Sequence, residues 1–234
     1  MQRIAKRLQI LTLIFCILFG CLFTRVNIFG AGNSSIVFSK SREPTKKIAL
    51  TFDDGPHPRY TERILKILER YDIKATFFVI GVNIQNYPEP FAKIVAAGHE
   101  IGNHTYHHKT LSGTCDATIR EEIRKTDEII FKTAGYRPKI FRPPEGAYGE
   151  CALKAAQSMD LRMILWTVDT RDWERPSAQT IVERVMANVK GGSILLFHDY
   201  MHKNAHTLEA LEIILPKLLE KGFEFVTVSE LIER

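Results

Sequence analysis

The chain has 234 residues, of which 45% are hydrophobic, and its formal net charge is +5. This length is enough for one domain of ordinary size with a full hydrophobic core. Residues 1–32 contain Arg3, Lys6, Arg7 and Arg25 and no acidic residue, so the rest of the chain carries a net charge of only +1. Such a balanced remainder excludes a surface that follows a phosphate backbone, and we expect no nucleic-acid partner.

The N-terminus, residues 1–32, has the pattern of a targeting segment. Three basic residues precede an apolar run over residues 10–23, which only Thr12 interrupts and which Arg25 follows. This run fits the apolar region of a signal peptide better than a full membrane span. A cleaved signal ending near residues 30–32, an uncleaved membrane anchor, and a lipoprotein signal at Cys21 all remain open. In each case the positive flank stays inside, and the domain is exported to the cell envelope or beyond.

Residues 33–46 form a predicted polar linker, and residues 47–234 form the predicted catalytic domain. Within the domain, short apolar segments alternate with longer amphipathic ones. The strand-like segments are 48–52, 75–80, 99–103, 140–142, 163–168, 194–197 and 223–228. The helix-like segments are 61–71, 89–97, 117–133, 148–159, 177–189 and 207–221, with a short tail at 229–234. About seven β/α units predict parallel strands wrapped by helices, as an open sheet or a barrel.

Polar side chains gather directly after successive strands of this predicted domain. The clusters are Asp53-Asp54, 104–108, 142–146, 169–173 and His198-Asp199. Right-handed crossovers would bring the loops that follow the strands to one face. We therefore expect the five clusters to converge on one rim.

Two of these clusters suggest a metal site. Adjacent carboxylates repel each other, so one of Asp53 and Asp54 tends to be neutralised or to hold a cation. His104 and His108 are four residues apart, and one helical turn would place both rings on one side. His107 competes as a ligand, and spacing alone does not choose between it and His108. Two histidines, one carboxylate and open positions for water describe a catalytic rather than a structural metal site.

The polar clusters also resemble, in chain order, the five motifs of the polysaccharide deacetylases. These are the NodB-homology domains of carbohydrate esterase family four. The motifs are Thr51-Phe52-Asp53-Asp54-Gly55-Pro56, His104-Thr105-Tyr106-His107-His108, Arg142-Pro143-Pro144-Glu145-Gly146, Asp169-Thr170-Arg171-Asp172-Trp173 and Leu196-Phe197-His198. The resemblance spans residues 46–232 and implies a distorted (β/α)7 barrel with its active site at the C-terminal ends of the strands. Within this family, the chain is similar to exported bacterial deacetylases that act on peptidoglycan or chitooligosaccharides, including those of spore formers.

The resemblance implies a role for each motif residue. Asp54, His104 and His108 would hold a divalent metal, usually zinc, with cobalt or another divalent ion as an alternative. Asp53 would be the general base and Arg142 would pair with it, while His198 would be the general acid and Asp172 would fix its tautomer. A backbone N–H at Glu145 would help to stabilise the oxyanion. The implied substrate contacts are Glu145, Tyr148, Trp173 and Leu196, and many relatives carry Tyr at the position of Glu145.

The implied reaction is metal-dependent removal of N-acetyl groups from N-acetylhexosamine residues of a cell-envelope polysaccharide, such as peptidoglycan or a chitin-like polymer. Acetate and a free amine would be the products. A glycosidase is a poor alternative, because two adjacent carboxylates do not flank a scissile bond and the histidines would have no role. The alternative from another class is an envelope protein that keeps the fold for glycan binding or morphogenesis without turnover. The sequence does not distinguish N-acetylglucosamine from N-acetylmuramic acid as the target, or predict the oligomeric state.

The cysteines do not indicate a second metal site. Cys16 and Cys21 lie in the targeting segment, and Cys115 and Cys151 lack the spacing of a zinc ribbon. Export would permit a disulfide between Cys115 and Cys151, but the sequence leaves this pairing open.

Overall fold

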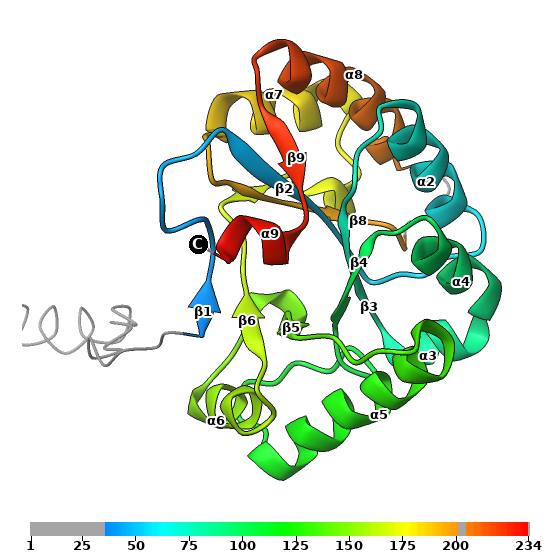
Figure 1. Ribbon diagram of the computed structural model, residues 1–234, viewed down its shortest axis with the longest axis vertical. Coiled ribbons are helices and arrows are strands. Elements are labelled where there is room, and N and C mark those ends of the chain that lie inside the picture. The colour runs from blue at the N-terminus through cyan, green and yellow to red at the C-terminus, as the bar shows by residue number, and fades with distance from the viewer. Residues whose placement is uncertain (1–35, 201–204, 234) are drawn as a thin grey trace, which may run out of the picture. The chain divides into compact units, whose positions relative to one another are not determined.

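A computed structural model describes residues 36–200 and 205–233 of the chain (Figure 1). The targeting segment expected at residues 1–32 lies outside the described residues. Within the described part, no helix has both the length and the apolar character needed to cross a bilayer.

In the part of the chain that the structure describes, nine strands form one sheet whose ladders are all parallel. The strands are β1 (Val37–Phe38), β2 (Lys47–Asp53), β3 (Thr76–Val79), β4 (Glu100–Asn103), β5 (Ile140–Phe141), β6 (Arg162–Ile164), β7 (Val168–Asp169), β8 (Ile194–His198) and β9 (Glu224–Val226). Their order is β1-β6-β5-β4-β3-β2-β8-β7, and β9 pairs with the first half of β2. The predicted parallel α/β architecture is therefore confirmed.

Strand β2 is the centre of the sheet. It has β3 on one side and β8 on the other, and its residues from Ile48 to Asp53 are all buried. A strand covered on both faces reads as a continuous apolar run rather than an alternating one, which is the pattern of residues 48–52. The same register places Asp53 opposite His198 of β8. Two of the predicted catalytic residues are thus cross-strand neighbours.

The sheet curls into a half-barrel, in agreement with the distorted (β/α)7 barrel that was predicted. Strands β1 and β7 are the two ends of the described strand order. Isolated contacts join the residues that follow β1 to those that precede β8. The Ser41 N–H donates to the Gly192 carbonyl at 2.9 Å, and Lys40 forms an antiparallel bridge with Ser193. The barrel is therefore closed on this side by single hydrogen bonds instead of a full ladder.

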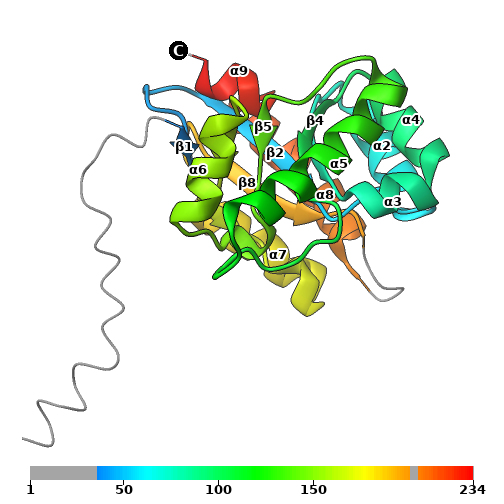
Figure 2. The ribbon, with the colours of Figure 1, turned by 90° about the horizontal axis from the view of Figure 1, so that it is seen from below.

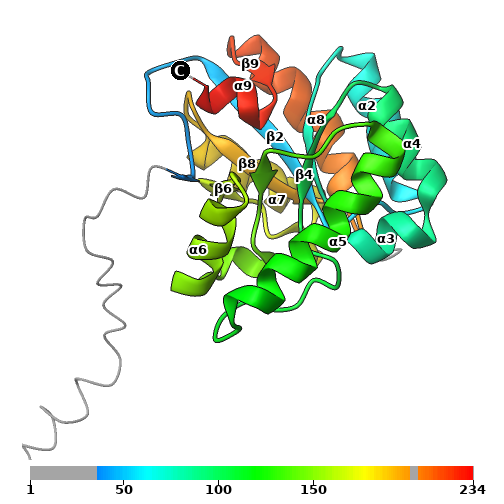
Figure 3. The ribbon, with the colours of Figure 1, turned by 60° about the horizontal axis from the view of Figure 1, so that its bottom comes forward.

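The helices cover the outside of the strands except for the last one, which packs on the inner side of the curled sheet, where Val228, Leu231 and Ile232 cluster with Ala49, Phe78 and Ile194 (Figures 1 and 2). They are α2 (Tyr60–Arg70), α3 (Gly81–Asn86), α4 (Pro88–Ala96), α5 (Asp116–Ala134), α6 (Glu150–Ser158), α7 (Ala178–Asn188), α8 (Thr207–Glu220) and α9 (Val228–Ile232), with single 3-10 turns at η1 (Pro144–Gly146) and η2 (Asp172–Glu174). Figure 3 shows α3, α4 and α5 side by side outside β3 and β4, and these three helices contact one another. Helix α8 packs against α2 and α7.

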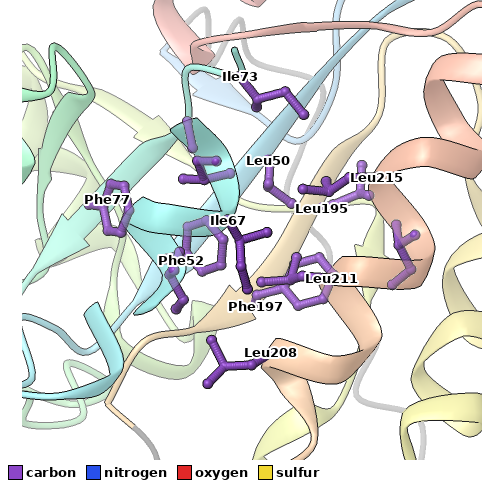
Figure 4. Close-up of a cluster of buried hydrophobic side chains, with 14 of the residues drawn as sticks. Leu50, Phe52, Ile67, Ile73, Phe77, Leu195, Phe197, Leu208, Leu211 and Leu215 are labelled. Carbon is purple, nitrogen blue, oxygen red and sulfur yellow. The ribbon is translucent and has the colours of Figure 1, made fainter. Parts of the chain in front are cut away.

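The largest hydrophobic cluster lies between β2, β3 and β8 and the helices α2 and α8 (Figure 4). Phe52 stacks on Phe77 with ring centroids 5.0 Å apart, and Phe197 lies 5.9 Å from Phe52. All three rings are fully buried. Truncating such a ring to alanine typically costs about 3–5 kcal/mol. The strand ends that carry Asp53 and His198 therefore rest on a rigid support.

Four segments differ from the sequence prediction, and one of them is helix α3, which the sequence did not indicate. Strand β1 lies inside residues 33–46, which were predicted to be a linker, and pairs with β6. The predicted strand 163–168 is two strands because the chain changes neighbours: the Met163 N–H donates to Ile36, and the Thr167 N–H donates to Ile194. The tail after residue 228 contains helix α9, which Thr227 and Glu230 cap reciprocally in a capping box.

Cys115 and Cys151 are both free and exposed. The disulfide left open by the sequence is not formed.

Candidate active site

The first buried pair at the strand ends joins Asp53 to Arg142. Asp53 is the last residue of β2, and Arg142 follows β5 directly. Arg142 Nη1 donates to Asp53 Oδ1 at 2.7 Å, and the two side chains are 0% and 5% exposed. A charge-assisted hydrogen bond at this depth fixes the orientation of the carboxylate.

Further contacts fix the Arg142 guanidinium. Nη1 also donates to Thr51 Oγ1 at 2.8 Å, and Nε and Nη2 donate to the carbonyls of Ile164 and Leu165 at 3.3 and 3.2 Å. The guanidinium carbon lies 4.1 Å from the centre of the Phe78 ring. These carbonyls belong to the break between β6 and β7, so the arginine satisfies backbone groups that a continuous strand would have paired. Burial lowers the pKa of Arg142, while the charge of Asp53 and its hydrogen bond oppose that effect.

Asp54, His104 and His108 form a group that could hold a metal ion. One ligand atom from each lies within 4.8 Å of the others. The Asp54 Oδ1 atom is 3.2 Å from His108 Nε2 and 3.5 Å from His104 Nε2. Asp54, Thr105 and His108 all have positive φ, so the two loops turn sharply here and aim the three side chains at one point.

The His104 ring is held in the tautomer that a metal ligand needs. Its Nδ1 lies 2.8 Å from the Arg142 carbonyl oxygen. A carbonyl only accepts, so Nδ1 carries the proton and Nε2 keeps a free lone pair on the side of Asp54. Such a second hydrogen bond is the usual partner of a metal-ligating histidine.

His107 points away from this group. Its Nδ1 lies 2.8 Å from Glu122 Oε1, and its backbone N–H donates to Glu122 Oε2 at the same distance. Glu122 is a buried residue of α5 that also accepts the backbone N–H of Tyr106 at 3.2 Å. The sequence left His107 and His108 as alternatives, and the structure brings His108 to Asp54 and ties His107 to the helix.

The environment of Asp54 suits a cation. Burial acts to raise the pKa of Asp54, but the neighbouring His104 and His108 side chains outweigh burial and lower this pKa well below its usual range. The Oδ1 atom is buried and has no hydrogen-bond partner among the described residues. A buried carboxylate oxygen without a partner is costly. Two imidazoles and one carboxylate are the donor set of a three-ligand catalytic site for zinc or a similar divalent metal, so the residues fit such an ion.

His198 and Asp172 form the second buried pair. His198 ends β8, and its Nδ1 lies 2.6 Å from Asp172 Oδ1, while its backbone N–H donates to Oδ2 at 3.0 Å. Thr207 of α8 donates a further hydrogen bond to Oδ2 at 2.9 Å. Burial acts to lower the pKa of His198, but Asp172, together with the charges of Asp54 and Asp53, raises it to about 9. Near neutral pH the ring is therefore an imidazolium that can donate a proton from Nε2.

These groups line one cavity of about 400 Å³. Its walls are made by Asp53, Asp54, His104, His108, Glu145, Trp166, Asp169, Trp173, Leu196 and His198. Leu196 and the two tryptophans supply apolar surface beside the acids and histidines. A cavity of this size with a few convergent polar groups is typical of a small-molecule or sugar site.

Three of the four predicted substrate contacts line the cavity, and one does not. Glu145, Leu196 and Trp173 line the cavity, and the Trp173 side of it is open, because this residue is 56% exposed. Tyr148 is not among the cavity residues and packs instead against a separate hydrophobic cluster around Phe141. No contact of the Glu145 backbone N–H tests the oxyanion role, which stays a prediction.

Trp166 is a cavity residue that the sequence prediction missed. It follows β6, and its ring lies over the Arg142 guanidinium at 5.6 Å. The ring packs so closely on Gly146 that a Cβ there would approach it to 2.6 Å. The sequence offered one signal, the glycine at the end of the Arg142-Pro143-Pro144-Glu145-Gly146 motif, because a glycine can mark a close approach of another group to the backbone. The sequence did not show that this group is Trp166.

The chemical capacity of the site follows from this geometry. A buried carboxylate held by an arginine can accept a proton, and a buried imidazolium held by a carboxylate can donate one. Between them lies a group of ligands that fits a divalent cation. This arrangement suits hydrolysis of an acyl group by water, with one residue as base and another as acid.

Sequence comparisons agree with this chemistry. The profile of the polysaccharide deacetylase family matches residues 40–164. A Bacillus cereus peptidoglycan-N-acetylglucosamine deacetylase is 40% identical over 80% of this chain and 88% of its own length. A Bacillus subtilis peptidoglycan-N-acetylmuramic acid deacetylase is 41% identical over 82% of this chain and 40% of its own length.

Structural comparisons extend the match beyond the profile, which ends before Asp172 and His198. A solved peptidoglycan N-acetylglucosamine deacetylase has a TM-score of 0.81 and 38% identity, covering 85% of this chain and 93% of that one. A Bacillus anthracis protein described as a pseudoenzyme of carbohydrate esterase family four has a TM-score of 0.78 and 33% identity. The match covers 83% of this chain and 68% of that one. The profile, the identities and the shared fold agree that the chain belongs to the polysaccharide deacetylase family, carbohydrate esterase family four.

Proposed function

We propose that the chain hydrolyses the N-acetyl group of N-acetylhexosamine residues in a cell-envelope polysaccharide and releases acetate and a free amine. One observation carries this proposal. Asp53, held by Arg142, and His198, held by Asp172, end the neighbouring strands β2 and β8 in direct register, so that a candidate base and a candidate acid lie side by side. The identity of the peptidoglycan deacetylases to this chain supports the polymer class.

Asp54, His104 and His108 would hold the metal. We propose zinc, because two histidines, one carboxylate and open positions form a typical catalytic zinc site. When bound, the cation supplies Lewis-acid polarisation of the acetamide carbonyl and lowers the pKa of the attacking water.

Asp53 is the residue that takes the proton from the attacking water. Its Oδ1 is engaged by Arg142, while Oδ2 lies 3.8 Å from His104 Nε2, on the side of the ligand group. The arginine thus holds the carboxylate in place and leaves its second oxygen facing the ligand group, where the attacking water is expected to lie. Correctly positioned general bases contribute about 10²–10⁴-fold in rate.

His198 is the residue that protonates the departing nitrogen. An amide nitrogen leaves as an amine only when it gains a proton, and the His198 ring is an imidazolium near neutral pH because Asp172 holds its pKa at about 9. Breaking the C–N bond then transfers the Nε2 proton to the sugar amine, and solvent restores it afterwards. Leu196, Trp166 and Trp173 supply the apolar surface for the acetyl methyl and the sugar ring.

Acetate release by the full chain from chitooligosaccharides and from peptidoglycan tests the reaction. We expect acetate in stoichiometric amounts with free amines, and mass spectrometry should show acetyl loss. Asp53→Asn is the matched control, because it keeps the side-chain shape and removes the basic oxygen. Equal acetate release by the wild-type protein and Asp53→Asn would refute the assignment. Binding of glycan without acetate release would favour the non-catalytic alternative, which the pseudoenzyme relative makes a real one.

Export to the cell envelope is a separate proposal, supported by the basic and apolar pattern of residues 1–32. Fractionation of the producing cells, with N-terminal sequencing of the mature protein, tests it. A start within residues 30–36 would indicate a cleaved signal, and an intact N-terminus in the membrane fraction would indicate an anchor. Recovery of the intact chain in the soluble interior of the cell would refute export.

A further inference from the structure

The loop that carries His108 is held by side chains instead of a strand ladder or a helix. The backbone N–H groups of residues 105–108 all donate to side-chain oxygens. Thr105 donates to Asn103 at 2.8 Å, Tyr106 and His107 donate to Glu122 at 3.2 and 2.8 Å, and His108 donates to Thr105 at 3.1 Å. Backbone donors away from water need such acceptors, so these contacts determine the course of the loop.

Two residues of this loop have a backbone conformation that depends on their surroundings. Thr105 and His108 have φ values of 67° and 56°. A residue other than glycine is strained in this left-handed region, and it stays there only where its neighbours over-determine it. The position of the His108 ring therefore depends on the contacts that hold the loop.

Glu122 holds the middle of the loop from a helix. Its side chain is only 9% exposed, and its Oε2 accepts the backbone N–H groups of both Tyr106 and His107, while Oε1 lies 2.8 Å from His107 Nδ1. The residue belongs to α5, a helix of 19 residues that contacts α3 and α6. Ile119 and Ile123 of the same helix are fully buried. A single carboxylate on a rigid element thus fixes two successive residues of the loop.

We infer that Glu122 is a positioning residue of the metal site, which holds the loop so that the His108 ring reaches the ion beside His104; this inference rests on the proposed function. Glu122 acts through the backbone of Tyr106 and His107, and so through the course of the chain instead of the His107 imidazole. Removing a group that orients a metal ligand typically costs about 10–100-fold in metal affinity.

Two substitutions separate the reach of Glu122 from its charge. Glu122→Asp keeps the charge, but it is one methylene shorter and withdraws both oxygens from the loop. Glu122→Gln keeps the length and removes the charge. Its amide oxygen can still accept the two backbone N–H groups, and its NH2 group can donate to His107 Nδ1 in the other tautomer of that ring. Positioning by hydrogen bonds therefore predicts that the aspartate weakens metal binding and the glutamine does not.

Two controls separate this effect from a loss of stability. Glu121→Asp makes the same change at the neighbouring helix position, where the side chain is 45% exposed and pairs with Arg124. Leu215→Ala opens a cavity beside α8, in the largest hydrophobic cluster, which contains no residue of the loop 105–108. The second control lowers the stability of the fold and leaves the contacts of the loop in place.

The assay is binding of zinc alone to the full chain, in competition with a chromophoric chelator, at a temperature where circular dichroism shows every variant folded. We expect Glu122→Asp to weaken zinc affinity by at least about tenfold, and Glu122→Gln and both controls to stay close to the wild-type value. Cobalt bound in place of zinc absorbs visible light according to the arrangement of its ligands. Its spectrum should change in Glu122→Asp and stay the same in the other variants.

Wild-type zinc affinity in Glu122→Asp would overturn the inference. So would an equal loss in Glu122→Gln, because charge would then be the cause, or an equal loss in Leu215→Ala, because stability would then be the cause. A wild-type chain that binds no zinc would overturn the proposed metal site and the inference with it. Zinc binding as expected, without acetate release from peptidoglycan or chitooligosaccharides, would refute the proposed reaction and support the inference, so the two failures are distinguishable.

Discussion

Replacement of Arg142 by methionine tests whether the Asp53–Arg142 pair supports the fold as well as the reaction. The methionine keeps much of the apolar stem but removes every donor. Asp53, whose side chain is 5% exposed, would lose its cation, and Thr51 and the carbonyls of Ile164 and Leu165 would lose their donors. Removing one partner of a buried ion pair typically costs about 3–5 kcal/mol. For a chain of this size, that corresponds to a fall in Tm of about 6–20 °C.

The assay is thermal and urea unfolding of the full chain, followed by circular dichroism, with Arg70→Met as the matched control. Arg70 pairs with Glu212 on the surface, where such pairs contribute about 0–1 kcal/mol. The double variant Asp53→Asn/Arg142→Met removes the stranded charge. It should recover part of the lost stability and none of the activity. Equal stability of Arg142→Met and Arg70→Met would refute the reasoning, as would a double variant less stable than Arg142→Met alone.

Two further predictions concern the metal and the acid. His104→Ala should lose the bound divalent ion in elemental analysis, whereas His107→Ala should retain it, because His107 bonds to Glu122; equal loss in both variants would contradict the ligand assignment. Because the raised pKa of His198, about 9, keeps the acid protonated, activity should fall as pH rises through that value. In Asp172→Asn the charge and the hydrogen bond that raise this pKa are lost, so the alkaline limb of the kcat/KM profile should move to lower pH. An unmoved limb would mean that another group titrates there.

Much of the fold was predictable because its signals are local. The apolar run 48–52 predicts β2 without knowledge of its neighbours, since a strand buried on both faces needs apolar residues throughout. The polar residues that end the strands predict a shared rim, since parallel strands end on one side of a sheet. Asp53 and His198 were expected on one rim. That they face each other directly across β2 and β8 is known only from the strand pairing in the structure.

The unpredicted parts depend on partners distant in sequence. Strand β1 has only two residues and gains its hydrogen bonds from β6, more than 120 residues away. No local pattern marks it. The break after residue 164 likewise follows from a change of neighbours, from Ile36 to Ile194. Trp166 reaches the cavity only because of that break, and for this reason its place in the site could not be read from its surroundings in the chain.

The same break explains why Arg142 belongs to both the fold and the site. A strand that changes neighbours leaves carbonyl groups unpaired, and buried carbonyls require donors. A guanidinium offers several donors in one plane. Arg142 gives two of its nitrogens to the carbonyls of Ile164 and Leu165 and the third to Asp53 and Thr51. Lysine could not reproduce this set, because its ammonium is a single point of charge without the planar fork. The irregular closure of the half-barrel and the orientation of the general base therefore rest on one side chain, so a change at the closure should alter catalysis as well as stability.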